Sequence, residues 1–94
     1  MANYLARVEL KLASPEDYEK LHSSMQSRGY VRKIEGEDGV VYQLPVGTYF
    51  VTGTSAALSV ALNAAVDAAN ETGRKSAVLV TDWNSVRWYG LAND

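Results

Sequence analysis

Apolar and charged side chains alternate along the first part of the chain, from Tyr4 to Leu12. Over this length, strict alternation predicts a β-strand with one face in a hydrophobic core and the other in solvent. The predicted inner positions are Tyr4, Ala6, Val8, Leu10 and Leu12, and the charged outer positions are Arg7, Glu9 and Lys11.

The pattern then changes to a helical one. Ser14 is a preferred N-cap residue, and Pro15 suits the first position of a helix because its fixed φ is already helical. A helix is therefore predicted over 15–27. Its apolar stripe consists of Tyr18, Leu21 and Met25, with His22 on the same side.

A second helix is predicted over 56–71, with Thr54 or Ser55 as its N-cap and Gly73 as the residue that stops it. Leucine and alanine recur at helical spacing in this segment, which indicates an amphipathic helix. The predicted apolar face consists of Leu58, Leu62, Ala65 and Ala69, with Val66 beside it.

Three further strands are predicted at 30–35, 48–52 and 77–80, and residues 40–44 can extend the ladder after a turn-rich hairpin. The order strand-helix-strand-strand-helix-strand is that of a ferredoxin-like α+β fold. In this βαββαβ arrangement, two helices cover one face of a four-stranded antiparallel sheet. We expect a single domain over 1–94 whose aromatic tail, 83–94, can add a further strand.

Composition narrows the possible classes of protein. The 94 residues provide for one core, and the absence of cysteine excludes disulfides and thiolate metal sites. A reducing, cytoplasmic location is the simplest interpretation. No segment approaches the ~18 consecutive apolar residues of a membrane span, so no membrane association is expected. With a net charge of −2, a general phosphate-binding surface is unexpected, and DNA is not an expected partner.

Candidate chemistry is sparse. Phosphate-binding loops, dinucleotide fingerprints and zinc or calcium motifs are all missing from the sequence, so no cofactor and no metal are expected. His22 is the one histidine, and an imidazole with a pKa near ~6.5 is the natural acid or base at neutral pH. The alternative is that His22 merely shields the core beside the helix stripe.

A basic cluster lies where the first helix ends and the next strand begins. Arg28, Arg32 and Lys33, with Tyr30 among them, could hold a phosphate backbone with a base stacked nearby. The alternative is an ordinary charged surface.

Two of the predicted strands are apolar on both faces, and the tail is rich in tryptophan. A sheet with helices on one side is expected to have a polar outer face, so a partner is expected to cover this one. We therefore predict a homodimer. Its interface would include Tyr49, Val51, Leu79, Trp83, Trp88 and Tyr89.

Several segments resemble the GhoS family of small bacterial antitoxins. The resemblance lies in 29–39 (GYVRKIEGEDG), 42–44 (YQL), 49–56 (YFVTGTSA) and the first strand and helix through 21–25 (LHSSM), and it covers about residues 4–80. It implies a ferredoxin-like fold, related to small CRISPR-associated and VapD-type ribonucleases. It also implies an endoribonuclease that cuts the messenger RNA of the toxin in a toxin-antitoxin system.

The resemblance places the family's proposed catalytic basic residue at or next to His22, where this chain has histidine instead of arginine. The related metal-dependent nucleases have an aspartate at the end of the first strand. This chain has Leu12 and Ala13 there, which favours a mechanism without metal. Two functions therefore remain: a metal-independent endoribonuclease that binds RNA, or a catalytically silent dimeric protein-binding module that acts as an antitoxin or inhibitor.

Overall fold

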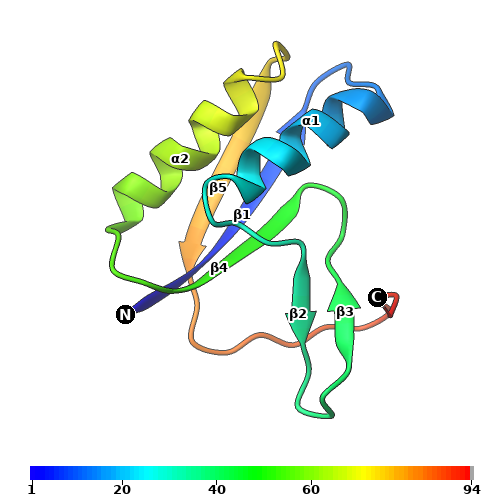
Figure 1. The fold of residues 1–94 in the computed structure, drawn as a ribbon, viewed down its shortest axis with the longest axis vertical. Coiled ribbons are helices and arrows are strands. Elements are labelled where there is room, and N and C mark those ends of the chain that lie inside the picture. The colour runs from blue at the N-terminus through cyan, green and yellow to red at the C-terminus, as the bar shows by residue number, and fades with distance from the viewer. Residues whose placement is uncertain (94) are drawn as a thin grey trace.

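The computed structural model describes residues 1–93, which fold into an α+β domain around the central strand β1. Strands β4 and β5 flank β1, and both run antiparallel to it (Figure 1). The elements are β1 (Ala2–Leu10), α1 (Pro15–Gln26), β2 (Lys33–Glu35), β3 (Val41–Gln43), β4 (Thr48–Thr54), α2 (Leu58–Asn70) and β5 (Ser76–Asp82).

The predicted single four-stranded sheet is not what the structure contains. The sheet has three strands in the order β4-β1-β5, while β2 and β3 pair with each other in a separate two-stranded ribbon. Val31 is the point of attachment. It exchanges two backbone hydrogen bonds with Phe50 of β4, with N–O distances of 2.7 and 2.8 Å. The expected strand at 30–35 thus contributes one bridge to the main sheet before it leaves in the ribbon.

The chain turns sharply between the ribbon and β4. Pro45 cannot donate to a ladder, and Gly47 has a φ of 83°, a conformation that favours glycine. The carbonyl of Gly47 accepts a 2.7 Å hydrogen bond from the amide of Val8. A Cβ at position 47 would overlap with the Val8 carbonyl oxygen, so this approach to β1 requires glycine. These two residues give a physical reason why the ribbon does not continue the sheet.

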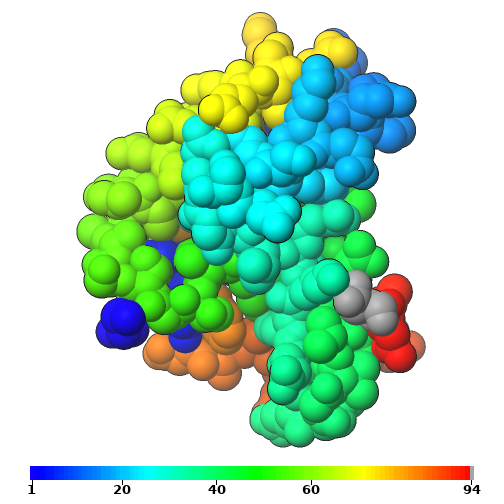
Figure 2. Space-filling view, viewed as in Figure 1, coloured from blue at the N-terminus to red at the C-terminus, as the bar shows by residue number. Residues whose placement is uncertain are grey.

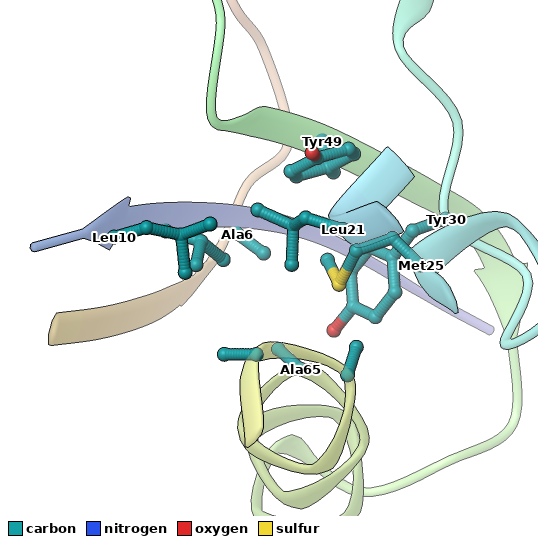
Figure 3. Close-up of a cluster of buried hydrophobic side chains, with 10 residues drawn as sticks. Ala6, Leu10, Leu21, Met25, Tyr30, Tyr49 and Ala65 are labelled. Carbon is teal, nitrogen blue, oxygen red and sulfur yellow. The ribbon is translucent and has the colours of Figure 1, made fainter. Parts of the chain in front are cut away.

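Both helices cover the same face of the sheet, as predicted. The inner positions of β1 from Tyr4 to Leu10 are buried, and Leu21 and Met25 of α1 pack between them and α2 (Figure 3). Leu12 departs from the predicted alternation. It is 95% exposed in a turn after β1 has ended, with a φ of 52°.

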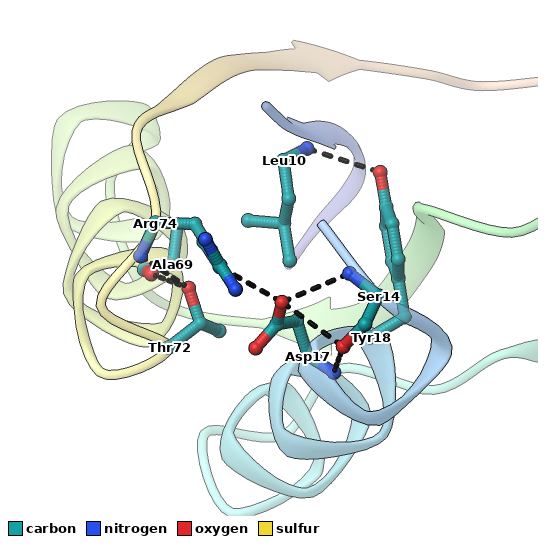
Figure 4. Close-up of polar contacts among 7 residues, drawn as sticks. All are labelled: Leu10, Ser14, Asp17, Tyr18, Ala69, Thr72 and Arg74. Carbon is teal, nitrogen blue, oxygen red and sulfur yellow. Dashed lines mark hydrogen bonds and ion pairs between the residues drawn. The ribbon is translucent and has the colours of Figure 1, made fainter. Parts of the chain in front are cut away.

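The start of α1 is fixed by a capping box. The Ser14 hydroxyl accepts from the Asp17 amide, and the Asp17 carboxylate accepts from the Ser14 amide at 2.9 Å. The same carboxylate accepts a 2.8 Å hydrogen bond from Arg74, which follows α2 (Figure 4). Tyr18, one residue further along α1, accepts at 3.0 Å from the amide of Leu10 at the end of β1. These contacts join the two helices to one end of the sheet.

The buried face of α2 differs from the prediction. Leu58 and Leu62 are exposed, and the helix instead packs through a row of alanines. The small side chains of Ala65 and its neighbours allow α2 to lie close to the sheet (Figure 3). The helix is therefore turned about its axis so that the alanines, and not the leucines, face the sheet. The N-cap is Ala57, which makes no side-chain capping bond, so Thr54 and Ser55 do not cap this helix. The buried alanines are Ala61, Ala65, Ala68 and Ala69.

The tail after β5 forms no strand of its own within residues 83–93; instead it is attached at both ends. The Trp83 amide donates to the carbonyl of Asn3 at 3.0 Å, and the Gln43 amide donates to the carbonyl of Ala92 at 2.9 Å. Between these points the tail crosses from the end of β5 to the β2–β3 ribbon, which projects from the body of the molecule (Figures 1 and 2). Within residues 1–93, neither helix has the length and apolar character needed to cross a membrane.

Candidate nucleic-acid interface

A pocket of about 450 Å³ lies between α1 and the segment that enters the ribbon. His22 and Glu19 contribute from α1, Arg32 and Lys33 from the following segment, and Gln43 from β3. The structure therefore brings together the candidate histidine and two of the three candidate basic residues. Carboxylate, imidazole and cationic groups therefore share one open cavity, and such groups can take up or donate protons and stabilise negative charge.

Tyr49 determines the orientation of the His22 ring. Its hydroxyl oxygen lies 2.5 Å from Nδ1 of His22, and the ring centroids are 5.7 Å apart. Tyr49 is completely buried, and the described hydrogen bonds give its hydroxyl no other partner. The buried O–H needs an acceptor, so we infer that it donates to Nδ1. Nε2 of His22 then carries the hydrogen of the neutral ring.

His22 is held in its neutral form. Partial burial lowers its pKa below the ordinary 6.5, and the positive charge of Arg32 lowers it further, while Glu19 opposes both effects. The hydrogen bond from Tyr49 also favours the neutral ring, because an Nδ1 that accepts a hydrogen bond carries no proton. The site thus presents a neutral imidazole beside cations at neutral pH.

Arg28 makes a different contact from the predicted one. Its guanidinium lies 2.9 Å from the Glu71 carboxylate and also donates to the hydroxyl of Ser24, which in turn donates to Glu71. The hydrogen bond from Arg28 lowers the pKa of Glu71, and the same contact raises the pKa of Arg28. Its charge is already compensated at the contact between α1 and α2, so Arg28 is a helix-joining residue in this structure.

Tyr30 is not available to stack on a base. Its ring is buried in the core, and its hydroxyl donates to the carbonyl of Ala61 in α2 at 2.8 Å (Figure 3). The burial also raises the pKa of Tyr30. The predicted role of Tyr30 in stacking on a base is therefore wrong, because its ring packs in the core.

Two of the residues expected at a dimer interface belong to the protomer's own core. Tyr49 is completely buried, which corrects its assignment to an exposed interface, and Val51 packs against the same core from a half-buried position. Both point toward the helices because they pair with inner positions of β1: Tyr49 with Ala6, and Val51 with Tyr4. The sequence pattern alone could not decide which face of this strand is the inner one.

Of the other four, Leu79 lies on the outer face of the sheet, and the remaining three belong to the tail. Leu79 is 60% exposed and pairs with Arg7, and Tyr89 is almost fully exposed. Trp83 packs against Phe50 with ring centroids 4.9 Å apart. Trp88 packs against Tyr42 at 5.5 Å. The chain's own tail therefore covers part of the apolar outer face that was expected to require a partner.

Glu19 and Tyr49 are site residues that sequence reasoning did not assign to the pocket. Glu19 precedes His22 by one helical turn, and this spacing was a usable signal. Tyr49 approaches His22 only through the packing of β4 under α1, for which the sequence carries no local signal. Among residues 1–93, no group of three or more histidine, aspartate or glutamate side chains is arranged to hold a metal ion. The sequence matches no protein-family model and no curated protein.

Proposed function

We propose that the protein binds single-stranded RNA at the His22 pocket and cleaves it without a metal, as an antitoxin-type endoribonuclease of the kind it resembles. The observation that carries this proposal is the position of His22, whose neutral ring shares an open pocket with Glu19 and Arg32. The cationic groups would attract the phosphate, and the imidazole and carboxylate would act on the reacting atoms.

A ferredoxin-like topology is part of the same proposal. The order of elements and the antiparallel sheet order β4-β1-β5, with a helix after β1 and another after β4, are compatible with a split βαβ arrangement. The bridge from Val31 to Phe50 lies where the fourth strand would pair with β4. We interpret that strand as reduced to this single bridge.

The chemistry would proceed through the RNA's own 2′-hydroxyl. Its oxygen attacks the adjacent phosphorus while the P–O5′ bond breaks, which leaves a 2′,3′-cyclic phosphate and a 5′-hydroxyl. Glu19 would take the 2′-hydroxyl proton, and solvent would supply one to the departing O5′. Because Tyr49 occupies Nδ1, His22 would donate a hydrogen bond from Nε2–H to a non-bridging phosphate oxygen and keep its proton, and Arg32 would stabilise the same developing charge.

The test is incubation of the pure protein with mixed single-stranded RNA in EDTA. The parent is expected to produce fragments with cyclic phosphate ends, and RNA with a 2′-deoxy residue at the cut site is expected to resist. Glu19→Gln, which removes the base, is expected to lower the rate by ~10²-fold or more. His22→Ala, which removes the Nε2–H donor, is expected to lower it by a similar factor. Tyr89→Phe, a change at an exposed residue remote in sequence from α1, is the control and is expected to retain activity.

A silent binding module is the second candidate, and the exposed apolar residues on α2 favour it. Leu58, Val60 and Leu62 are all exposed on this helix, which suits contact with a protein partner. Lack of cleavage by the parent in EDTA, and again after Mg²⁺ is added, would reject the nuclease and leave this alternative.

A further inference from the structure

A second pocket, of about 480 Å³, is lined in part by the tail and lies next to the first, with which it shares two lining residues. Val31 and Lys33 line both pockets. The floor of the second pocket includes Phe50 and Ile34, and its outer wall includes Trp83 and Trp88 from the tail. The backbone bonds at Trp83 and Ala92 anchor this segment at both ends, so the wall is a fixed part of the fold.

Trp83, which lines this pocket, has an unsatisfied polar group. Its indole nitrogen, Nε1, is buried and has no hydrogen-bond acceptor among the described residues. An unsatisfied buried donor costs free energy unless a bound group or water accepts from it. The indole ring packs against Phe50 with centroids 4.9 Å apart, so this buried donor has a defined position next to the pocket that Trp83 lines.

The charges around the pocket are balanced. Lys33 and Arg87 contribute positive groups, while Glu35 and Glu37 contribute carboxylates. A phosphate alone would not be favoured by such a set. A nucleobase would be, because it offers flat apolar faces to the aromatic rings and both acceptors and N–H donors on its edge.

We infer that the tail pocket binds one base of a single-stranded RNA whose backbone continues over Val31 and Lys33 into the His22 pocket. The base stacks against the tryptophan wall, its carbonyl oxygen receives the Nε1 hydrogen of Trp83, and Glu35 or Glu37 accepts from a ring N–H and the adjacent exocyclic amine. This inference rests on the proposed function for its substrate class. It adds a recognition subsite, and it predicts a preference for guanine, whose edge combines an acceptor with adjacent N–H donors.

The experiment measures binding of fluorescein-labelled RNA oligonucleotides to the full chain in EDTA, in the Glu19→Gln background so that the RNA stays intact. Trp83→Phe keeps an aromatic ring against Phe50 but removes the donor and part of the stacking area, and it is expected to weaken binding roughly fivefold. Trp88→Ala removes stacking area and is expected to weaken binding about tenfold. Tyr89→Phe is the matched aromatic control and is expected to bind like its parent.

Thr52→Leu gives a test that leaves both tryptophans in place. Thr52 is exposed on β4 and lines the pocket, so the larger side chain is expected to obstruct the base without disturbing the core. Circular dichroism shows whether each variant is folded. RNA binding that is unchanged in folded Trp83→Phe and Thr52→Leu would overturn the base subsite, even if the parent cleaves RNA.

Failure of the proposed function has a different signature. Titration of the parent with guanosine 5′-monophosphate, followed by tryptophan fluorescence, tests the pocket without any cleavage. Quenching that is lost in Thr52→Leu, in a protein that never cuts RNA, would reject the nuclease and retain the base site. An absence of both quenching and RNA binding would reject both proposals.

Discussion

The hydroxyl of Tyr49 and Nδ1 of His22 lie 2.5 Å apart, although 26 residues separate them in the chain. The contact joins the completely buried Tyr49 of β4 to the pocket on α1. It therefore links the packing of the core to the chemistry of the site. A donor at Nδ1 fixes one tautomer of the imidazole and opposes its protonation.

Tyr49→Phe is expected to raise the pKa of His22 toward its ordinary 6.5 and to release the ring from the Nε2–H tautomer. The ring stays half-buried, so the shift is upward but incomplete. NMR titration of the His22 ring, with nitrogen chemical shifts to identify the tautomer, measures both effects. If the pKa and tautomer are the same in the variant, the hydroxyl does not donate to this ring.

Replacement of His22 by glutamine is expected to flatten the dependence of stability on pH. The pKa of His22 is lower in the folded chain than the ordinary 6.5 of the unfolded chain, so the unfolded state binds more protons between these two values. The parent consequently loses stability as pH falls through 6.5 toward the folded pKa. His22→Gln is expected not to show this loss. Urea unfolding between about pH 4 and 8 gives the free energy of unfolding of both proteins. If it depends on pH in the same way in both, the prediction is wrong.

The cap of α1 is expected to contribute about 1 kcal/mol to stability, since Ser14→Ala leaves the Asp17 amide without its side-chain acceptor. For a domain of this size the melting temperature would fall by about 4–8 °C. Ser23→Ala, an exposed change within the same helix, is the control and is expected to leave it nearly unchanged. An equal fall in melting temperature in both variants would show that the Ser14 cap does not stabilise the helix.

Acid is expected to weaken the same end of the molecule. The backbone hydrogen bond from Ser14 and the contact with Arg74 lower the pKa of Asp17 below 3.8. A depressed carboxyl pKa stabilises the fold above 3.8, and this contribution is lost as pH falls through the folded value. Asp17→Asn is expected to remove that acid-sensitive component, as measured by unfolding at pH 2 to 5.

The two leucines Leu21 and Leu62 separate what the sequence could predict from what it could not. Leu21 belongs to a stripe whose neighbours are charged, so helical periodicity identified its buried side. In α2, alanines lie on several sides of the helix, and the larger leucines led to the prediction of the wrong buried face. The alanines face the sheet because the helix packs closely against it. The distance between helix and sheet decides this, and no local sequence pattern indicates that distance. The pairing of His22 with Tyr49 was inaccessible for the same reason.

Alanine substitution at these positions tests the assignment of faces. Leu21→Ala removes a fully buried side chain and is expected to cost about 2–5 kcal/mol. Leu62→Ala, at an exposed position where alanine also favours the helix, is expected to cost less than about 1 kcal/mol. Chemical denaturation of both variants gives the two free energies, and a larger loss at Leu62 would mean that the helix is rotated from its described orientation.

Self-association through the outer sheet face remains a prediction, now centred on Leu79. This side chain is 60% exposed opposite Arg7, while Trp83 and Trp88 pack against Phe50 and Tyr42 of their own protomer. If a second copy covers the face, the parent is expected to scatter light as a dimer at ~100 μM, since an interface of standard size survives that dilution. Leu79→Glu is expected to give a monomer because it places a charge in the contact. Leu58→Glu, on the exposed side of α2, is the matched control and is expected to stay dimeric. A parent that is monomeric at this concentration would exclude the dimer, and dissociation by Leu58→Glu alone would move the interface to the helix.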